Sequence, residues 1–399
     1  GVLVPSVVQA TVTARNEVTP GGAGVTYYVS PDGRDTNPGT LAAPFQTIAH
    51  AASLVKAGDT VSVKAGTYRE SVNLVGRSGA RSDWITFAAF GDGPVILDGS
   101  DPELVATGQN RWSVYTGSVY RTPLSYVPAP YMAVDGLRAY HHPSLDSLVA
   151  GINGIPAGWF YDGAFLYLRT KDGSDPDHRV VQVARRQYGF ELGKSRYVAI
   201  QGFTIRFYGG AGIRFNGDES DILVDGNTLQ NNAHGIRKGG RGGSRYTIQG
   251  NTISETEVST WPWGYVKRTE HEAAGIALFA LDQGAVVRDN TITGYFDGIH
   301  INYWSPALGY NFDSDVYRNA ISDCGDDGTE LEGSNQTNVR FWGNTITRCL
   351  TGVSVTPVLR GPVYVFRNIV VQARGMGFKI GSSSSAKSAT RPTAKSKNP

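Results

Sequence analysis

Apolar and polar residues alternate in a short pattern that recurs through the second half of the chain. Each copy reads glycine, apolar residue, any residue, apolar residue, any residue, and its glycines stand at positions 189, 212, 235, 275, 298, 328, 352 and 377. By subtraction, successive glycines are 23, 23, 40, 23, 30, 24 and 25 residues apart. Because residues two apart share one face of an extended chain, each copy predicts a short β-strand with one buried face.

A second series, made of asparagines, runs in step with these glycines. Its members are Asn227, Asn251, Asn290, Asn319, Asn344 and Asn368. Two series with one shared period indicate a unit of strands and turns that is stacked on itself. The spacing of a leucine-rich repeat and the period of a helical repeat are both absent, so these two repeat classes are excluded. We therefore predict an all-β fold, a parallel β-helix with about three strands per coil. The two long intervals are coils that carry insertions near residues 255–273 and 303–312.

The first hundred residues predict a cap for this solenoid. Ile48, Ala51, Ala52 and Val55 have helical spacing between Pro44 and Gly58, which indicates one amphipathic α-helix. Such a helix can cover the open end of a β-helix, which is otherwise an exposed sheet edge.

The breaks in the period suggest how the chain is divided. Residues 101–187 lack the repeat, are rich in aromatic residues and contain a hairpin signal at Tyr161–Gly163. We expect an N-terminal extension, one β-helix domain and a flexible tail or linker, with these bounds: 1–25 for the extension; 26–381 for the domain, divided into cap and first coils 26–100, elaboration 101–187 and regular coils 188–381; and 382–399 for the tail.

Composition excludes several classes of function. The net charge of +2 argues against a protein that binds nucleic acid by bulk phosphate attraction. No apolar run reaches the ~18 residues that a membrane span needs. Two cysteines cannot form a disulfide-rich scaffold or a four-thiolate zinc site. Cys324 and Cys349 each follow a ladder asparagine by five residues. They should stack in adjacent coils, either as buried apolar side chains or as a disulfide.

Glycine is abundant, with 50 residues in 399, against a usual share of ~7%. We expect the eight repeat glycines to mark one corner of successive coils, where the backbone must turn tightly.

Several motifs in the first part of the chain resemble a known superfamily. They are Tyr27–Gly33, Asn37–Thr40, Pro44–Ile48, Gly58–Val61 and Gly66–Tyr68. With the repeats, they resemble right-handed parallel β-helix proteins of the pectate-lyase-like superfamily, in its bacterial carbohydrate-active form, over residues 26–381. The resemblance implies a right-handed coil and a secreted or cell-surface bacterial protein. It does not select a reaction, because the superfamily includes lyases, glycoside hydrolases, epimerases and phage tailspikes.

The repeat register predicts which side chains share the outer face of the solenoid. Residues two and four places after each glycine should point outward, and this places Arg214, Arg237, His300, Asn302, Glu330, Glu332 and Lys379 on one face, flanked by Asp297 and Asp327. The insertions should wall this face with Trp261, Trp263, Tyr265, Lys267, Arg268, Glu270, His271, Glu272, Tyr303 and Trp304. Aromatic walls beside a charged groove suit sugar rings. The alternative for any single residue is a solvated surface side chain, but so many functional groups in adjacent coils favour a binding site.

Two reactions fit this face, and the first is a lyase reaction on a uronic-acid-containing polysaccharide. Asn302, Glu330 and Glu332 could hold Ca²⁺ through oxygen ligands, which is similar to the Asn and Glu-x-Glu site of alginate- and dermatan-cleaving β-helix lyases. His300, Lys267 or Lys379 could act as the base, and Arg214 and Arg237 could bind carboxylates. The segment Gly333–Val339 lacks the lysine that follows Glu-x-Glu in those lyases.

The second reaction is glycoside hydrolysis by paired carboxylates, for which Asp297, Asp327, Glu330 and Glu332 supply candidates. His300 could tune the pKa of Glu330 beside it. A non-catalytic glycan-binding β-helix is the third interpretation, and the acidic group at 327–332 counts against it. We favour the lyase, acting as a monomer on a polysaccharide, with no organic cofactor and with no nucleic-acid or membrane partner.

Overall fold

The computed structural model describes the chain in several stretches. The described residues are 20–151, 155, 157–255, 263–267, 272–303, 311–333, 336–356, 358 and 360–381. At positions 264, 302, 303, 332 and 333 only the course of the backbone is described.

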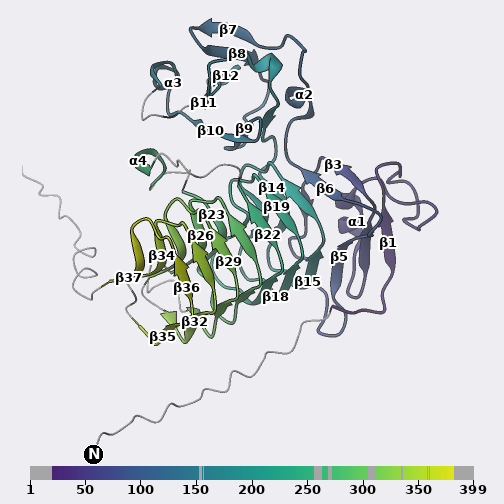
Figure 1. The fold of residues 1–399 in the computed structure, drawn as a ribbon. Helices are drawn as coiled ribbons and strands as arrows, with labels where there is room; N and C mark the ends of the chain where they lie inside the picture. The colour runs from purple at the N-terminus through teal and green to yellow at the C-terminus, as the bar shows by residue number, and fades with distance from the viewer. Residues whose placement is uncertain are drawn as a thin grey trace, which may run out of the picture.

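The described residues wind into an all-β parallel solenoid whose coils share three long sheets, so the predicted fold class is confirmed (Figure 1). The first sheet has the order β1 (Thr26–Val29), β2 (Thr60–Val63), β5 (Ile85–Ala89), β15 (Arg196–Gln201), β18 (Ser220–Asp225), β21 (Ser244–Gln249), β24 (Val286–Arg288), β28 (Asp315–Tyr317), β32 (Val339–Trp342) and β35 (Val363–Phe366). Its strands pair in parallel, as the repeat requires.

The second sheet carries the predicted functional residues, and we call it the site sheet. Its order is β4 (Val72–Asn73), β14 (Tyr188–Leu192), β17 (Ala211–Phe215), β20 (Ile236–Lys238), β23 (Ala274–Phe279), β26 (Asp297–Tyr303), β30 (Asp327–Gly333), β34 (Thr351–Val355) and β37 (Met376–Ile380). The third sheet has the order β3 (Gly66–Tyr68), β6 (Val95–Asp98), β16 (Thr204–Arg206), β19 (Thr228–Gln230), β22 (Thr252–Ser254), β25 (Thr291–Thr293), β29 (Ala320–Ser322), β33 (Thr345–Thr347) and β36 (Ile369–Val371). Two short strands, β27 (Asn311–Phe312) and β31 (Gln336–Thr337), pair beside the first sheet.

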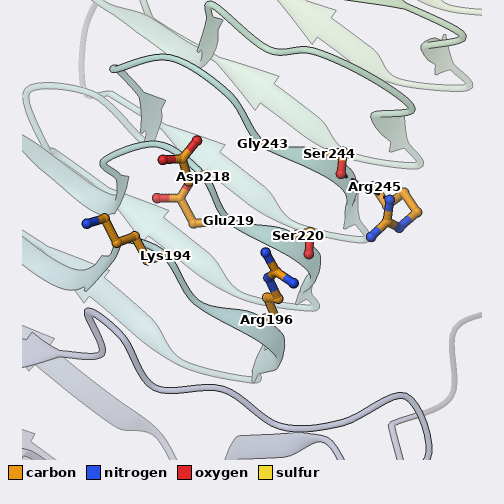
Figure 2. A pocket seen from close by; sticks show the side chains of 8 residues that line it. All are labelled: Lys194, Arg196, Asp218, Glu219, Ser220, Gly243, Ser244 and Arg245. Carbon is orange, nitrogen blue, oxygen red and sulfur yellow. Dashed lines mark hydrogen bonds between the residues drawn. The ribbon is translucent and has the colours of Figure 1, made fainter.

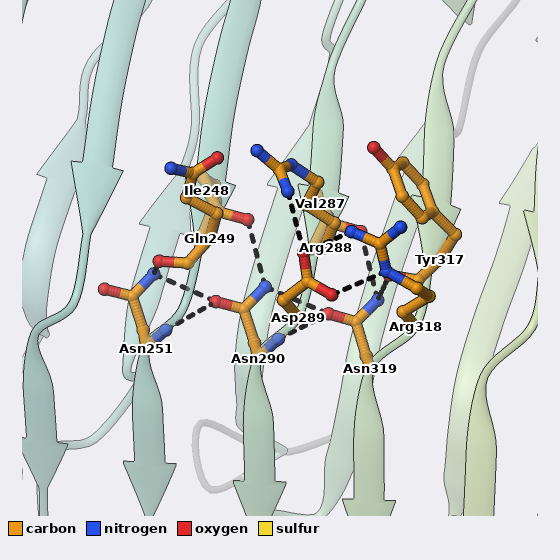
Figure 3. Close-up of polar contacts among 10 residues, drawn as sticks. All are labelled: Ile248, Gln249, Asn251, Val287, Arg288, Asp289, Asn290, Tyr317, Arg318 and Asn319. Atoms are coloured by element: carbon orange, nitrogen blue, oxygen red, sulfur yellow. Dashed lines mark hydrogen bonds and ion pairs between the residues drawn. The ribbon is translucent and has the colours of Figure 1, made fainter. Parts of the chain in front are cut away.

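The asparagine series forms a buried hydrogen-bonded ladder along the solenoid (Figure 3). The side-chain amide of Asn290 donates to Asn319 Oδ1 at 2.9 Å, and its own Oδ1 accepts from the amide of Asn251 at 2.9 Å. The same oxygen also accepts the backbone N–H of Asn251 at 3.0 Å. Each rung therefore ties one coil to the next and satisfies backbone groups that would otherwise be buried without a partner.

The repeat glycines occupy one corner, but the reason differs from the one predicted. Gly235 and Gly298 do not have a positive φ. A Cβ at Gly298 would lie 2.3 Å from the carbonyl oxygen of Gly328, and one at Gly235 would lie 2.5 Å from that of Gly275. Close approach of successive coils therefore requires glycine here, and the expectation of a special turn conformation was wrong.

The N-terminal end is covered by helix α1 (Ile48–Leu54), as predicted. Thr47 caps the helix by accepting the N–H of His50 through its side chain, and the carboxylate of Glu70 accepts the N–H groups of Ile48 and Ala49 at 3.0 and 2.8 Å. Ile48, Ala51 and Ala52 are buried in the same core as the coils.

Residues 101–187 form a separate, mostly antiparallel sheet beside the solenoid (Figure 1). Its order is β13 (Val181–Val183), β9 (Met132–Val134), β10 (Leu137–His141), β11 (Gly158–Tyr161), β12 (Phe165–Arg169), β8 (Val119–Pro123) and β7 (Ser113–Thr116). The predicted hairpin joins β11 to β12. Short helices accompany it, namely α2 (Pro102–Val105), α3 (Leu145–Ala150) and the 3₁₀ helix η2 (Pro176–His178). We call residues 101–187 the elaboration.

A buried ion pair fixes the elaboration to the coils. Arg138 of β10 donates to Glu255 at 3.0 Å, and the Tyr131 hydroxyl donates to the other carboxylate oxygen at 3.0 Å. Burial disfavours the charged guanidinium group and so lowers the pKa of Arg138. The carboxylate of Glu255 acts in the opposite direction, and the pKa lies above its ordinary value.

Two further features can be stated briefly. Cys324 and Cys349 are free thiols, both buried in the core. Among the described residues, every helix is too short or too polar to traverse a bilayer.

We expect the ladder to contribute measurably to stability. Asn290→Ala removes the acceptor of two Asn251 hydrogen bonds and should lower the free energy of unfolding by about 2–4 kcal/mol. Urea denaturation measures this, with Asn368→Ala as the control, because that rung is half-buried and ends the ladder. Equal losses for both variants would contradict a ladder whose strength depends on burial.

Candidate functional site

The candidate site lies at the N-terminal ends of two neighbouring strands of the site sheet. Strands β26 and β30 start at Asp297 and Asp327, and each aspartate is followed by a repeat glycine. The strands pair in parallel, with His300 opposite Glu330 and Asn302 opposite Glu332. The backbone N–H of Asp327 donates to Asp297 Oδ1 at 3.2 Å. Register therefore brings carboxylates from two coils together, with Asp326 immediately before the second strand.

Pairing along the site sheet confirms the register of the outward column. Reading from strand to strand, the partners are Glu191, Arg214, Arg237, Ala277, His300, Glu330, Ser354 and Lys379. The neighbours on either side of each outward residue point into the core, as Ile299 and Ile301 do on β26.

The middle of this column is covered, which the sequence did not predict. His300, Glu330 and Ser354 are all buried, whereas Arg214, Arg237 and Lys379 are half-buried. Helix α4 (Trp263–Val266) contributes to this side of the molecule, where Val266 packs with Phe296 and with Tyr140 of the elaboration. The carboxylates therefore lie in a medium of low polarity instead of an open groove.

Asp297, His300 and Glu330 form the centre of the site. One carboxylate oxygen of each acidic residue and one ring nitrogen of the histidine all lie within 4.8 Å of one another. His300 Nε2 is 3.3 Å from Glu330 Oε2. Burial, and then the charge of Lys267, lower the pKa of His300 to about 3, so its imidazole is neutral at neutral pH. A neutral ring can donate one N–H to the carboxylate.

The pKa of Asp297 is raised well above its usual range. Burial is the main cause, and the neighbouring carboxylates of Asp326 and Asp327 add to it, while Lys267 acts in the opposite direction. Burial likewise raises the pKa of Asp326, with help from Asp327. These like charges cannot all ionise at low cost, so the cluster holds a proton more tightly than an exposed aspartate does.

Lys267 is the cation of this cluster. Its Nζ lies 2.6 Å from Asp326 Oδ2 and 2.7 Å from Glu272 Oε1. Burial lowers its pKa, but these two hydrogen bonds outweigh burial and raise the pKa above the ordinary value. Lys267 thus stays protonated, and this arrangement does not favour it as a base.

Asp327 and Lys379 face each other at the edge of the cluster. Asp327 is fully buried, and neither of its carboxylate oxygens accepts a hydrogen bond from the described residues. Lys379 Nζ is 3.8 Å from Asp327 Oδ2, which is a charge contact without a short hydrogen bond.

Arg214 and Arg237 occupy adjacent positions in the column. Burial, and then the charge of Arg214, lower the pKa of Arg237. Within the described part of the chain, Nη1 of Arg214 and Nε of Arg237 are buried atoms without a hydrogen-bond acceptor. The guanidinium group of Arg214 also lies 5.8 Å from the ring centre of Tyr188.

The remaining predicted residues divide into two groups. Trp263 is exposed on α4 with its ring 5.2 Å from that of Phe296, and the Tyr265 hydroxyl donates to the carbonyl of His141. The other group lies outside the described residues or side chains: Trp261, Arg268, Glu270, His271, Trp304, Asn302, Tyr303 and Glu332. Of the three predicted Ca²⁺ ligands only the Glu330 side chain is described, and the metal site stays a prediction.

Sequence reasoning assigned no role to Asp326 and Phe296. Asp326 could have been found, because it stands directly before Asp327 in the same acidic motif. Phe296 carries no such signal, since α4 brings Val266 to it through an insertion without a repeat. Glu272 was predicted as part of the wall, but its ion pair with Lys267 was not.

A cavity of about 470 Å³ lies away from this cluster, at another corner of the solenoid (Figure 2). It is lined by residues from three successive turns that follow β14, β17 and β20, among them Lys194, Asp218 and Ser244. None of the residues predicted for the site lines it.

Comparison with known sequences supports the fold. A family model described as "Right handed beta helix region" matches residues 177–313, and one described as "Protein of unknown function (DUF1565)" matches residues 31–74. The uncharacterized protein YwoF of Bacillus subtilis is 32% identical over 173 residues, which are 43% of this chain and 33% of YwoF. Pectate lyase PEL9 of Emericella nidulans is 39% identical over 75 residues, 18% of each protein. The chain thus spans at most about a third of these relatives.

Solved structures agree on the architecture. XylC, in its complex with xylose, has a TM-score of 0.53 and 17% identity over 89% of this chain and 65% of its own. A structure described as a glycoside hydrolase has a TM-score of 0.50 and 11% identity over 90% of this chain and 96% of its own. At such identities the likeness concerns the fold alone.

Lys267 should be required to offset the buried carboxylates. Lys267→Met removes the cation, so its free energy of unfolding at pH 7 should fall by about 2 kcal/mol, a value reduced because the amine is partly exposed. The deficit should shrink at acid pH, because Asp297 and Asp326 have raised pKa values and can then be neutral in the fold. Denaturation at several pH values measures this, and Lys379→Met is the control with the longer charge contact. A deficit independent of pH would contradict the assignment.

The coil topology and the family-model match over residues 177–313 agree on one conclusion: the chain folds as a right-handed parallel β-helix.

Proposed function

We propose that the protein is a carbohydrate-active enzyme that hydrolyses a glycosidic bond with the carboxyl groups of Asp297 and Glu330. The observation that carries this proposal is their separation, since an oxygen of each lies within 4.8 Å of the other. Retaining glycosidases hold their two carboxyl groups about 5–5.5 Å apart, whereas inverting enzymes need about 6.5–9.5 Å. The pair therefore fits retention of the anomeric configuration.

The environments of the two groups suggest different roles. The raised pKa of Asp297 favours its protonated form, which suits the general acid that protonates the leaving oxygen. Glu330 lies beside the neutral imidazole of His300, which can donate to the carboxylate and hold it toward the substrate. Glu330 would attack the anomeric carbon as the leaving group departs, and a glycosyl-enzyme would form. Asp297, now ionised, would take a proton from the water that releases the sugar.

Lys267 and Asp326 would act on the chemistry through Asp297. Asp326 raises the pKa of Asp297, and Lys267 lowers it. Together they would set the pH at which the acid loses its proton. The titles of the two similar structures, XylC with xylose and a glycoside hydrolase, support a sugar substrate.

The lyase is the second candidate, and the observation that favours it is the pair Arg214 and Arg237, whose buried N–H groups could bind a uronate. Its weakness is the base, because His300 has a pKa of about 3 and Lys267 is held by two carboxylates. If Asn302, Glu330 and Glu332 hold Ca²⁺, the ion would neutralise a substrate carboxylate. A chelator that abolishes activity would support that metal site.

Substitution of either carboxyl group should abolish hydrolysis. Asp297→Asn and Glu330→Gln should each lower kcat by about 10³-fold or more, because each residue acts in the transition state. Assays with neutral and uronate-containing glycans measure reducing ends, and NMR of the first product reports the anomer. Glu191→Gln, in the same column but far along the sheet, is the matched control. An unsaturated product would overturn hydrolysis in favour of the lyase, and an inverted anomer would overturn the assigned pair.

The pH profile tests the role of Lys267 separately. Activity should fall as rising pH deprotonates Asp297, which gives the alkaline limb of kcat/KM. Lys267→Met removes a charge that lowers the pKa of Asp297, so this limb should move to higher pH. Lys379→Met removes a charge that acts on Asp326 and not directly on Asp297, so the limb should move less than in Lys267→Met. A limb that moves to lower pH in Lys267→Met would contradict Asp297 as the acid.

A further inference from the structure

Three successive turns form the cavity of about 470 Å³ where the chain passes from the site sheet to the first sheet (Figure 2). The residues that follow these turns pair in order along the first sheet: Arg196, Ser220 and Ser244. Two places earlier, the first two coils carry Lys194 and Asp218, whereas the third carries Gly242. A Cβ at Gly242 would collide with Oδ1 of Asp218. The glycine therefore makes room for this carboxylate over the third turn.

Buried polar side chains lie behind the cavity, where neighbouring coils carry apolar ones. Lys238 is fully buried, and it pairs with Phe215 of one neighbouring coil and with Leu278 of the other. Its ammonium group donates to three backbone carbonyl groups, those of Gly240 at 2.8 Å, Phe279 at 3.1 Å and Ala280 at 3.2 Å. Burial lowers the pKa of Lys238 to about 8, so the fold holds this charge at a cost in free energy.

Glu219 connects these buried groups to the cavity, which it lines. Its side chain is fully buried, since Oε1 accepts the backbone N–H of Gly217 at 2.7 Å and Oε2 accepts the Tyr246 hydroxyl at 2.7 Å. A Cβ at Gly243, which also lines the cavity, would lie 3.1 Å from Cε of Lys238. Lys238 thus fixes the third turn, and Glu219 fixes the second. Costly buried networks that fix the walls of a cavity are typical of binding sites.

Two cations and one carboxylate at the cavity have no partner among the described residues. Lys194 and Arg196 are exposed, and no described residue accepts a hydrogen bond from either side chain or forms an ion pair with it. Asp218 is also exposed and accepts no hydrogen bond through its side chain in the described part of the chain. Arg245 differs, because its guanidinium group donates to both oxygens of Asp221, at 2.7 and 2.6 Å. Figure 2 shows these groups on two sides of the cavity, with Lys194 and Asp218 on one and Arg196, Ser220 and Ser244 on the other.

We propose that this cavity binds an acidic sugar, whose anionic group is held by Lys194 and Arg196 and whose hydroxyl groups donate to Asp218. A guanidinium group bonds a carboxylate through two parallel N–H groups, and an ammonium group adds a point charge. A bare anion would meet the charge of Asp218 with no hydrogen to donate, so this carboxylate favours a ligand that also carries hydroxyl groups. The volume lies within the range of about 300–1,000 Å³ for small-molecule sites. Binding here is independent of hydrolysis by Asp297 and Glu330, which lie on later coils.

Saturation-transfer NMR with glucuronate tests this binding, because a single acidic sugar has no glycosidic bond to cleave. Glucose and acetate are its neutral and bare-anion counterparts, and we expect both to bind more weakly than glucuronate. Arg196→Gln should weaken glucuronate binding by about tenfold or more, since it removes a charged donor of two hydrogen bonds. Because Arg196 is exposed, its substitution should leave the circular dichroism spectrum and Tm unchanged.

The matched control is Arg367→Gln, which changes an exposed arginine of the last coil and should bind glucuronate like the unmodified chain. Asp218→Asn should narrow the preference for glucuronate over acetate, because it removes the repulsion that only hydroxyl groups offset. Asparagine also tolerates the φ of 63° at this position.

Equal binding of glucuronate and either counterpart would overturn the proposal, as would a preference that Asp218→Asn leaves unchanged. Glucuronate binding that survives in Arg196→Gln but is lost in Arg237→Gln would also overturn it. The acidic sugar would then lie over the arginines of the site sheet and not in this cavity.

Discussion

Hydrogen bonding between successive coils is the constraint on which the whole molecule depends. In a parallel solenoid each strand satisfies its backbone groups only through the strands before and after it. A slip of one residue would turn every inward side chain outward, so the register cannot drift. The asparagine ladder holds that register from inside, because each amide bonds the next coil at a fixed point. His300 lies opposite Glu330 for the same reason that Ile299 lies opposite Thr329.

The same constraint explains why the site brings like-charged carboxylates together at a cost in folding free energy. Strands 4.8 Å apart bring Asp297 and Asp327 together whether or not their charges repel. The fold then covers them, and burial strengthens every charge interaction that remains. Lys267, from an insertion, offsets the charges of Asp297 and Asp326 only in part, which leaves the pKa values of both aspartates raised. Buried carboxyl groups with strongly raised pKa values gather at functional sites.

The outward column could be predicted because it follows from one repeated glycine and the two-residue period of a strand. Insertions could not be predicted in this way, since a segment without a repeat carries no register. Lys267 reaches Asp326 across 59 residues of sequence, and Arg138 reaches Glu255 across 117. No local pattern marks either pair. The burial of His300 was missed for the same reason, because it depends on what lies over the sheet and not on the sheet itself.

The glycines illustrate the difference between a pattern and its cause. Their spacing was sufficient to find the coils, yet the expected reason, a tight turn, was wrong. At Gly298 the neighbouring coil leaves no room for a Cβ. Glycine is therefore required by the close approach of two successive coils and not by the local backbone conformation. This closeness extends to the end of the stack. A coil that is stable only beside another coil needs a cover where the stack begins, and α1 supplies this cover at the N-terminal end. Helix α1 therefore meets a requirement that the repeat itself sets, the same repeat that builds the site.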